Sequence, residues 1–153
     1  MFRLRIANLG LLTLLALLAP LACAASNEDP KPQEPRKPDL VLADLGQPMF
    51  VRHCASCHGH SGRGDGPAAE MLRAKPADLT KIAARRGGDF PAGEVARHID
   101  GRFRLPAHGS RDMPVWGYRF GANIPESELG EAIARGKIAS LVEYLMTLQD
   151  PPL

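Results

Sequence analysis

The stretch Cys54-Ala55-Ser56-Cys57-His58 determines how the rest of this 153-residue chain is interpreted. Its two thiols lie three residues apart, and an imidazole follows the second thiol directly. In a helical turn the positions i, i+3 and i+4 share one face, so these three side chains point the same way. This spacing is typical of a c-type haem attachment site, where two cysteine sulfurs bind the porphyrin vinyl groups and the histidine ligates the iron.

Three other uses of a cysteine pair remain as alternatives. A thioredoxin-like redox pair needs a βαβ context, and none precedes Cys54. A structural zinc site usually brings a second ligand pair at a distance, and no second CxxC or HxxxH follows, although His53 and His60 lie nearby. A disulfide across two residues closes a very short loop and adds little stability. Haem attachment is therefore the favoured interpretation.

Residues 1–24 are predicted to be an export signal. Arg3 and Arg5 precede an apolar run over 9–21, which is short for a membrane-spanning helix and contains Pro20 near its end. A retained N-terminal anchor is the alternative interpretation. Export agrees with the motif, because haem of this type is attached to the translocated chain, and it predicts a bacterial periplasmic location.

The end of the signal can be placed in two ways. Ala22-Cys23-Ala24 fits the small-x-small rule for cleavage to a soluble product. Leu21-Ala22-Cys23 also resembles a bacterial lipoprotein box, in which the signal ends at residue 22 and Cys23 carries the lipid anchor. In both cases Cys23 lies outside the folded domain, so Cys54 and Cys57 are its only thiols and haem attachment uses both.

Residues 25–40 are predicted to be a linker. The sequence DPKPQEPRKPD over 29–39 places four prolines among charges, which favours an extended spacer rather than a core. The folded domain is then predicted over residues 41–150. A domain of that size buries a modest core, to which a covalently held haem would contribute.

The charges are unevenly distributed along the chain. Without the two signal arginines, 17 basic and 17 acidic side chains remain, yet residues 52–119 hold 12 basic against 7 acidic ones. A basic rim on the haem-bearing part could steer an acidic redox partner protein, and a solvated mixed surface is the alternative. No basic face interleaved with aromatic residues occurs, so no nucleic-acid partner is expected.

The hydrophobic pattern predicts an all-α domain of short helices joined by long loops. The expected helices run from about Leu45 into Cys54, with Asp44 as the cap, over 68–74, over 78–85 and over 91–100. Residues 105–121 are expected to be a loop, since they contain two prolines and three glycines. The final helix is predicted from a helical stripe of apolar residues, namely Ile138, Leu141, Val142, Leu145 and Leu148.

In its opening helix, its CASCH motif, its Met-Pro loop and its final amphipathic helix, the chain resembles the class I c-type cytochromes over about residues 44–149. The segments GRGDGPAAEMLRAKPADLT and HGSRDMPVWG are similar to a bacterial monohaem subset of that class. The resemblance implies the cytochrome c fold, wrapped around one covalently attached haem c. It also implies that Gly46 and Phe50 of the first helix cross the last helix at Tyr144 and Leu145.

The resemblance further implies a loop around Pro76 whose carbonyl orients the imidazole of His58. Such a hydrogen bond fixes the tautomer of the histidine and tunes the iron. Pro67 is the competing candidate for this loop.

Met113 is the predicted second axial ligand. A thioether suits low-spin haem iron, and Pro114 stiffens the loop that carries it. His98 and His108 are alternative ligands. The indole N–H of Trp116 could reach a haem propionate, although a tryptophan is more often simply packed.

These observations predict an electron-transfer protein that carries one electron on a His/Met-ligated haem. No Ser/His/acid motif appears and the carboxylates are scattered, so no enzymatic activity is expected. Two alternatives stay open. The chain could be a fixed haem c subunit of a larger respiratory oxidoreductase, or a haem enzyme or gas sensor whose distal site is open because Met113 is displaced.

Overall fold

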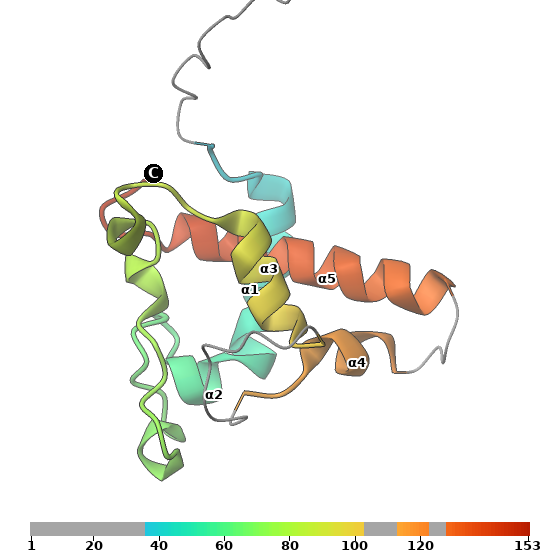
Figure 1. The fold of residues 1–153 in the computed structure, drawn as a ribbon, viewed down its shortest axis with the longest axis horizontal. Coiled ribbons are helices and arrows are strands. Elements are labelled where there is room, and N and C mark those ends of the chain that lie inside the picture. Colours follow the sequence, from blue (N-terminus) through green and yellow to red (C-terminus); the bar gives the residue numbers. More distant parts are fainter. Residues whose placement is uncertain (1–35, 103–112, 123–127) are drawn as a thin grey trace, which may run out of the picture. The chain divides into compact units, whose positions relative to one another are not determined.

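The computed structural model describes residues 36–102, 113–122 and 128–153. They belong to one compact unit, Gln33–Leu153. The predicted signal, Cys23 and His108 lie outside the described residues. All regular structure within the described ranges is helical, which confirms the all-α prediction (Figure 1). The elements are α1 (Leu40–His53), α2 (Ala55–His58), η1 (Ala69–Met71), η2 (Leu79–Lys81), η3 (Ala84–Arg86), α3 (Ala92–Asp100), α4 (Trp116–Gly121) and α5 (Glu128–Thr147).

Helix α1 begins five residues earlier than predicted. Asp39, rather than Asp44, caps it, because a carboxylate oxygen of Asp39 accepts the backbone N–H groups of Val41 and Leu42 at 3.0 and 3.2 Å. These N–H groups have no partner inside the helix, so the cap satisfies them. Pro48 consequently lies in the helix interior, where the missing N–H removes one backbone hydrogen bond.

The described end of the predicted linker packs against α5. The guanidinium of Arg36 pairs with the carboxylate of Glu143 and donates to the sulfur of Met146 at 2.9 Å. The backbone N–H of Asp39 donates to the second oxygen of Glu143 at 2.9 Å. Glu143 is only 4% exposed, so these contacts compensate a carboxylate that has lost most of its water.

Helices α1 and α5 form the most extensive helix pair of the unit. At their crossing, a Cβ atom on Gly46 would lie 2.1 Å from the carbonyl oxygen of Ser140, so only glycine permits this approach. One turn later the rings of Phe50 and Tyr144 meet with centroids 5.3 Å apart. The crossing predicted from the resemblance is therefore confirmed at Gly46 and Phe50.

Helix α3 agrees with its prediction. Pro91 precedes it, Val95 and Ile99 are buried one turn apart, and Gly101 ends it with a φ of +69°. A left-handed residue after the last turn is a common helix terminator, and glycine adopts it without strain.

Helix α4 was not predicted, because Gly117 and Gly121 suggested a loop. Trp116 and Phe120 are spaced by four residues, and both are buried. Their stacked rings give this short helix an apolar face against α5, and that burial outweighs the weak helical propensity of glycine. None of the described helices is both long enough and apolar enough to cross a membrane.

Candidate haem site

The turn that joins α1 to α2 brings the CASCH side chains together. Cys54 ends α1 and begins α2, and its carbonyl oxygen accepts the backbone N–H groups of Cys57 at 3.1 Å and His58 at 2.9 Å. Its own N–H donates to the carbonyl of Phe50 at 2.8 Å. The chain is therefore helical through the motif, as the i, i+3, i+4 spacing predicts.

The glycine-rich loop after the motif folds back onto this turn. The N–H groups of Gly64 and Gly66 donate to the carbonyls of His58 and Cys57, at 2.8 and 3.1 Å. A Cβ atom on Gly66 would lie 2.4 Å from the carbonyl oxygen of Ser56, so the loop approaches as closely as glycine allows. These hydrogen bonds satisfy the carbonyls at the end of α2 and hold the motif in one conformation.

The imidazole of His58 is oriented by a backbone carbonyl. Its Nδ1 lies 3.2 Å from the carbonyl oxygen of Ala77. Because a carbonyl can only accept, Nδ1 carries the proton and Nε2 keeps its lone pair for a metal. Burial lowers the pKa of His58, against a smaller opposite effect of the Ala77 hydrogen bond, so the neutral imidazole is favoured.

This carbonyl comes from the loop predicted for the role, one residue after Pro76. The carbonyl of Pro76 itself packs against Gly64, where a Cβ atom would lie 2.3 Å from it. Pro76 does not line the cavity described next.

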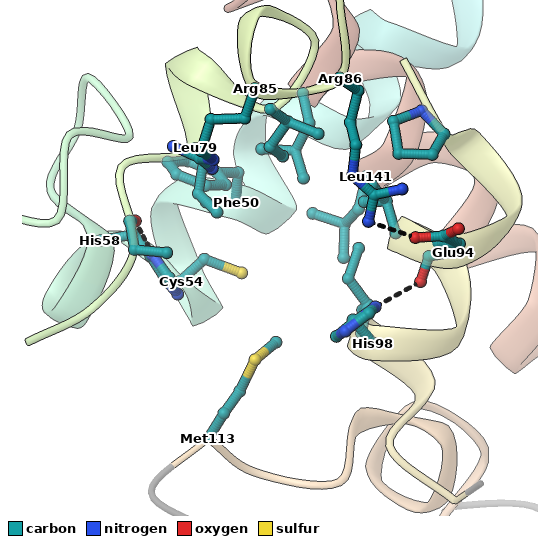
Figure 2. A pocket seen from close by; sticks show the side chains of 16 residues that line it. Phe50, Cys54, His58, Leu79, Arg85, Arg86, Glu94, His98, Met113 and Leu141 are labelled. Carbon is teal, nitrogen blue, oxygen red and sulfur yellow. Dashed lines mark hydrogen bonds and ion pairs between the residues drawn. The ribbon is translucent and has the colours of Figure 1, made fainter. Parts of the chain in front are cut away.

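A cavity of about 300 Å³ opens beside the motif. Figure 2 shows the sulfur atoms of Cys54 and Met113 facing into it, with His58 on its wall. Most of the remaining wall is apolar and comes from α1, the η2–η3 segment, α3 and α5. The principal apolar residues are Phe50, Leu79, Ile82, Val95, Ile99, Leu141 and Leu145.

The side of the cavity away from Cys54 is lined by Arg86, Glu94 and His98 (Figure 2). Arg86 pairs with Glu94 at 2.6 Å, and Arg85 donates to the carbonyl of Asp78 at 2.9 Å. His98 also lines this side, with its Nδ1 2.7 Å from the carbonyl oxygen of Glu94. A cavity with the Cys54 thiol at one side, an apolar body and the Arg86 guanidinium at the other fits haem, whose vinyl and propionate groups lie on opposite halves of the ring.

The donor atoms also fit haem better than zinc. Nowhere in the described residues do three or more His, Cys, Asp or Glu side chains converge, whereas a structural zinc site needs four ligands. Cys54 and Cys57 are not joined in a disulfide. Burial, with a smaller effect of Cys57, raises the pKa of Cys54 to about 11, so the free thiol would be a poor redox nucleophile.

The family model for cytochrome c matches residues 43–149. The chain belongs to the cytochrome c family. It therefore binds haem and takes part in haem-based electron transfer. This cytochrome c is 37% identical over 83 residues to a cbb3-type cytochrome c oxidase subunit, FixPc, from Rhizobium leguminosarum bv. viciae. The alignment covers 54% of this chain but only 24% of that relative, so the chain spans about a quarter of its length. No solved structure gives a significant match.

Trp116 of this cytochrome c lies in a packed aromatic cluster. Its ring stacks on Phe120 with centroids 5.1 Å apart, and His53 approaches it at 5.3 Å. Trp116 is 7% exposed and does not line the haem cavity. The packed alternative therefore describes its surroundings, and a propionate contact stays a prediction.

Sequence reasoning missed Ala77, Arg85, Arg86 and Glu94 as members of this site. A backbone carbonyl such as that of Ala77 has no residue-type signature. The pair Arg86 and Glu94 spans eight residues across Gly87 and Gly88, so helical spacing could not connect the two side chains.

Proposed function

We propose that this cytochrome c is an electron carrier with one haem c, held by thioether bonds to Cys54 and Cys57. His58 and Met113 are the axial ligands in this proposal. The observation that carries it is the contact between His58 Nδ1 and the Ala77 carbonyl, because it leaves Nε2 available to iron on the same turn as both thiols. Met113 supports it, since its sulfur faces the same cavity.

Haem bound here supplies a one-electron couple at its iron. The chain's residues tune that couple in three ways. Met113 as a ligand favours the reduced state and raises the reduction potential. The apolar walls formed by Leu79, Ile99 and Leu141 exclude water, and the Ala77 carbonyl increases the electron donation of His58.

The identity of the second axial ligand is tested with Met113→Ala and His98→Ala. We expect the purified ferric protein to show a methionine-to-iron charge-transfer band, which Met113→Ala abolishes and His98→Ala preserves. A high-spin ferric spectrum of the parent that binds added ligands readily would instead favour the open distal site of a haem enzyme or gas sensor. Loss of the band in His98→Ala alone would assign His98 as the ligand.

The attachment is tested by Cys54→Ser and Cys57→Ser. A thioether survives denaturation, so haem should migrate with the parent polypeptide on a denaturing gel. The pyridine haemochrome spectrum should shift when either cysteine is removed, because one vinyl group is then restored. Haem that separates from the denatured parent would contradict covalent attachment.

A second candidate function is a fixed haem c subunit of a larger respiratory oxidoreductase. The similarity to a cbb3-type oxidase subunit favours it. In this case the redox partner proteins are other subunits rather than diffusing donors and acceptors. Solubilised membranes from the native host should then yield the chain together with an oxidase, whereas a mobile carrier separates from it in a salt wash.

We propose the export signal over 1–24, the linker over 25–40 and the haem domain over 41–150, with the mature protein in the periplasm. Two cleavage points remain candidates. Cleavage after residue 24 gives a soluble product, and cleavage after residue 22 leaves a lipid anchor at Cys23. The mass of the mature N-terminal peptide distinguishes them, because a lipidated Cys23 adds the mass of its acyl chains.

A further inference from the structure

After α5, the buried side chain of Gln149 hydrogen-bonds to residues 79–83, a segment that contributes to the wall of the haem cavity. Gln149 is 4% exposed, and its side-chain amide makes three hydrogen bonds. Its oxygen accepts the backbone N–H of Ala83 at 2.9 Å. Its nitrogen donates to the carbonyls of Leu79 at 3.0 Å and Leu145 at 2.7 Å. One planar amide thus ties α5 to both ends of residues 79–83.

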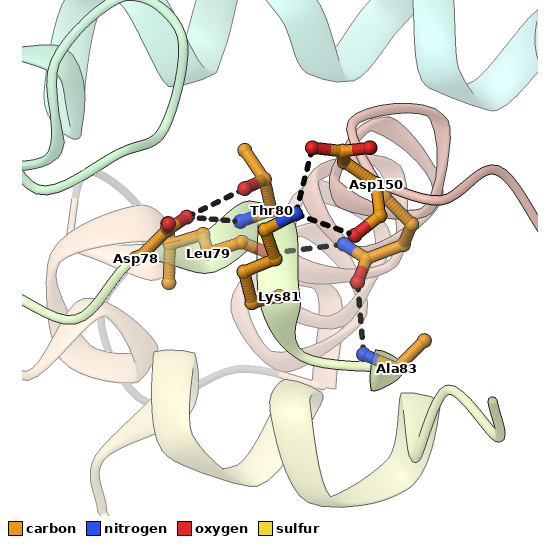
Figure 3. Close-up of polar contacts among 7 residues, drawn as sticks. Asp78, Leu79, Thr80, Lys81, Ala83 and Asp150 are labelled. Carbon is orange, nitrogen blue, oxygen red and sulfur yellow. Dashed lines mark hydrogen bonds and ion pairs between the residues drawn. The ribbon is translucent and has the colours of Figure 1, made fainter. Parts of the chain in front are cut away.

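The neighbouring residue adds an outer layer to this attachment (Figure 3). The backbone N–H of Asp150 donates to the carbonyl of Thr80 at 2.9 Å. The ammonium group of Lys81 donates to the carboxylate of Asp150 at 2.7 Å and to its carbonyl at 3.0 Å. The Lys81–Asp150 pair is exposed, so it contributes less than the buried amide.

The segment held by Gln149 belongs to the haem cavity. Leu79 and Ile82 line that cavity, and so does Ala77, two residues before Leu79. The N–H of Leu79 donates to the carbonyl of Gly62 at 2.7 Å, while its carbonyl accepts from Gln149. The peptide groups on both sides of Leu79 are therefore fixed, and this fixes the approach of the Ala77 carbonyl to His58.

We propose that Gln149 is a positioning residue for the proximal histidine. It holds residues 79–83 so that the Ala77 carbonyl stays within hydrogen-bond distance of His58 Nδ1, and in this way it lowers the reduction potential. The inference rests on the proposed function, in which His58 is an iron ligand. A carbonyl that accepts from the ligand's other nitrogen increases its basicity, and a more basic ligand stabilises the ferric state.

A methionine at position 149 keeps the length of the side chain but removes its amide. The Ala83 N–H and the Leu79 carbonyl then lose a buried partner, which is costly enough to displace the segment. In the haem-loaded protein, Gln149→Met is expected to raise the reduction potential. It is also expected to make the His58 ring N–H exchange with solvent about tenfold faster, the factor for losing one such hydrogen bond.

Val142→Ala is the matched control. Val142 is buried on α5, the helix that precedes Gln149; it is 4% exposed and does not line the cavity. It should lower resistance to denaturant while leaving the potential and the ring N–H exchange unchanged. A purely structural role for Gln149 would make the two variants alike in all three measurements.

Two results overturn the inference. The first is a Gln149→Met protein with unchanged potential and exchange. The second is a lower potential with unchanged exchange, which indicates a change in the iron surroundings other than at His58. If Gln149→Met does not yield a haem-loaded protein, Lys81→Met tests the inference by the same two measurements. We expect a smaller rise in the reduction potential, and an unchanged potential and exchange rate would overturn the inference. A parent protein without covalent haem would instead reject the proposed function itself.

Discussion

Replacing Gly46 with alanine tests how closely α1 and α5 approach. The added Cβ would lie 2.1 Å from the carbonyl oxygen of Ser140 and 2.9 Å from the Cβ of Tyr144. Carbon and oxygen atoms in contact are normally about 3.3 Å apart or more, so the helices would have to separate by roughly 1 Å. The obstacle is backbone, which cannot rotate away as a side chain could.

The magnitude follows from two opposing effects. Overpacking of a well-packed interface costs about 1–3 kcal/mol, and a backbone obstacle places this substitution near the upper end. Alanine in place of glycine in a helix gains roughly 1 kcal/mol of helical propensity. The expected net loss in the free energy of unfolding is about 2 kcal/mol, which corresponds to a fall of roughly 8 °C or more in Tm for a domain of this size.

Gly136→Ala provides the control on the same pair of helices. Gly136 lies within α5, and nothing stands within 4 Å of the position its Cβ would take. Only the propensity gain applies there, so this variant should be more stable than the parent by about 0.5–1 kcal/mol. Denaturant unfolding of the haem-loaded parent and variants measures both changes in unfolding free energy. The comparison requires that the three proteins have the same m-value. A Gly46→Ala variant that is as stable as Gly136→Ala would refute the close crossing at Ser140.

Three further outcomes are expected. Asp39→Ala should cost about 1 kcal/mol of unfolding free energy, because two N–H groups at the start of α1 lose their acceptor. Urea titration measures this loss, with Asp39→Asn as the control because it retains a capping oxygen. The Arg102 guanidinium at 2.7 Å lowers the pKa of Asp100, so this group stabilises the fold above the ordinary Asp pKa of about 4 and loses that contribution as the pH falls through its lower folded value. The stability gap between parent and Asp100→Asn should therefore shrink below about pH 4, and a gap independent of pH would contradict the pairing. Gly117→Ala, whose Cβ would lie 2.4 Å from atoms of both Asp100 and Arg102, should displace the ion pair and weaken the same pH dependence.

Local features of this fold were predictable from the sequence. The CASCH turn depends only on positions i to i+4, and α3 has a proline before it and a terminating glycine after it. The apolar stripe of α5 identified that helix without knowledge of its partner. In each case the relevant forces act between residues within a few turns of one another.

The features that were missed depend on distant contacts. The start of α1 was misplaced because Asp39 and Asp44 are equally good caps by residue type, and only Asp39 also meets Glu143 of α5. Helix α4 exists because Trp116 has a surface to pack against. Gln149 carries no signal in the sequence, since a lone glutamine near the end of a helix is usually solvated.

The crossing of α1 and α5 also has a consequence for the order of biogenesis. Residues 40–58 emerge from the ribosome well before residues 128–147, and the α1–α5 pair, the most extensive helix pair of the unit, cannot form until α5 is present. During synthesis Cys54 and Cys57 therefore lie on a segment that still lacks its main packing partner. The covalent attachment that we propose would find both thiols accessible in that interval, before native packing surrounds them. For that proposed attachment, the wide separation of the motif from α5 favours haem attachment before folding.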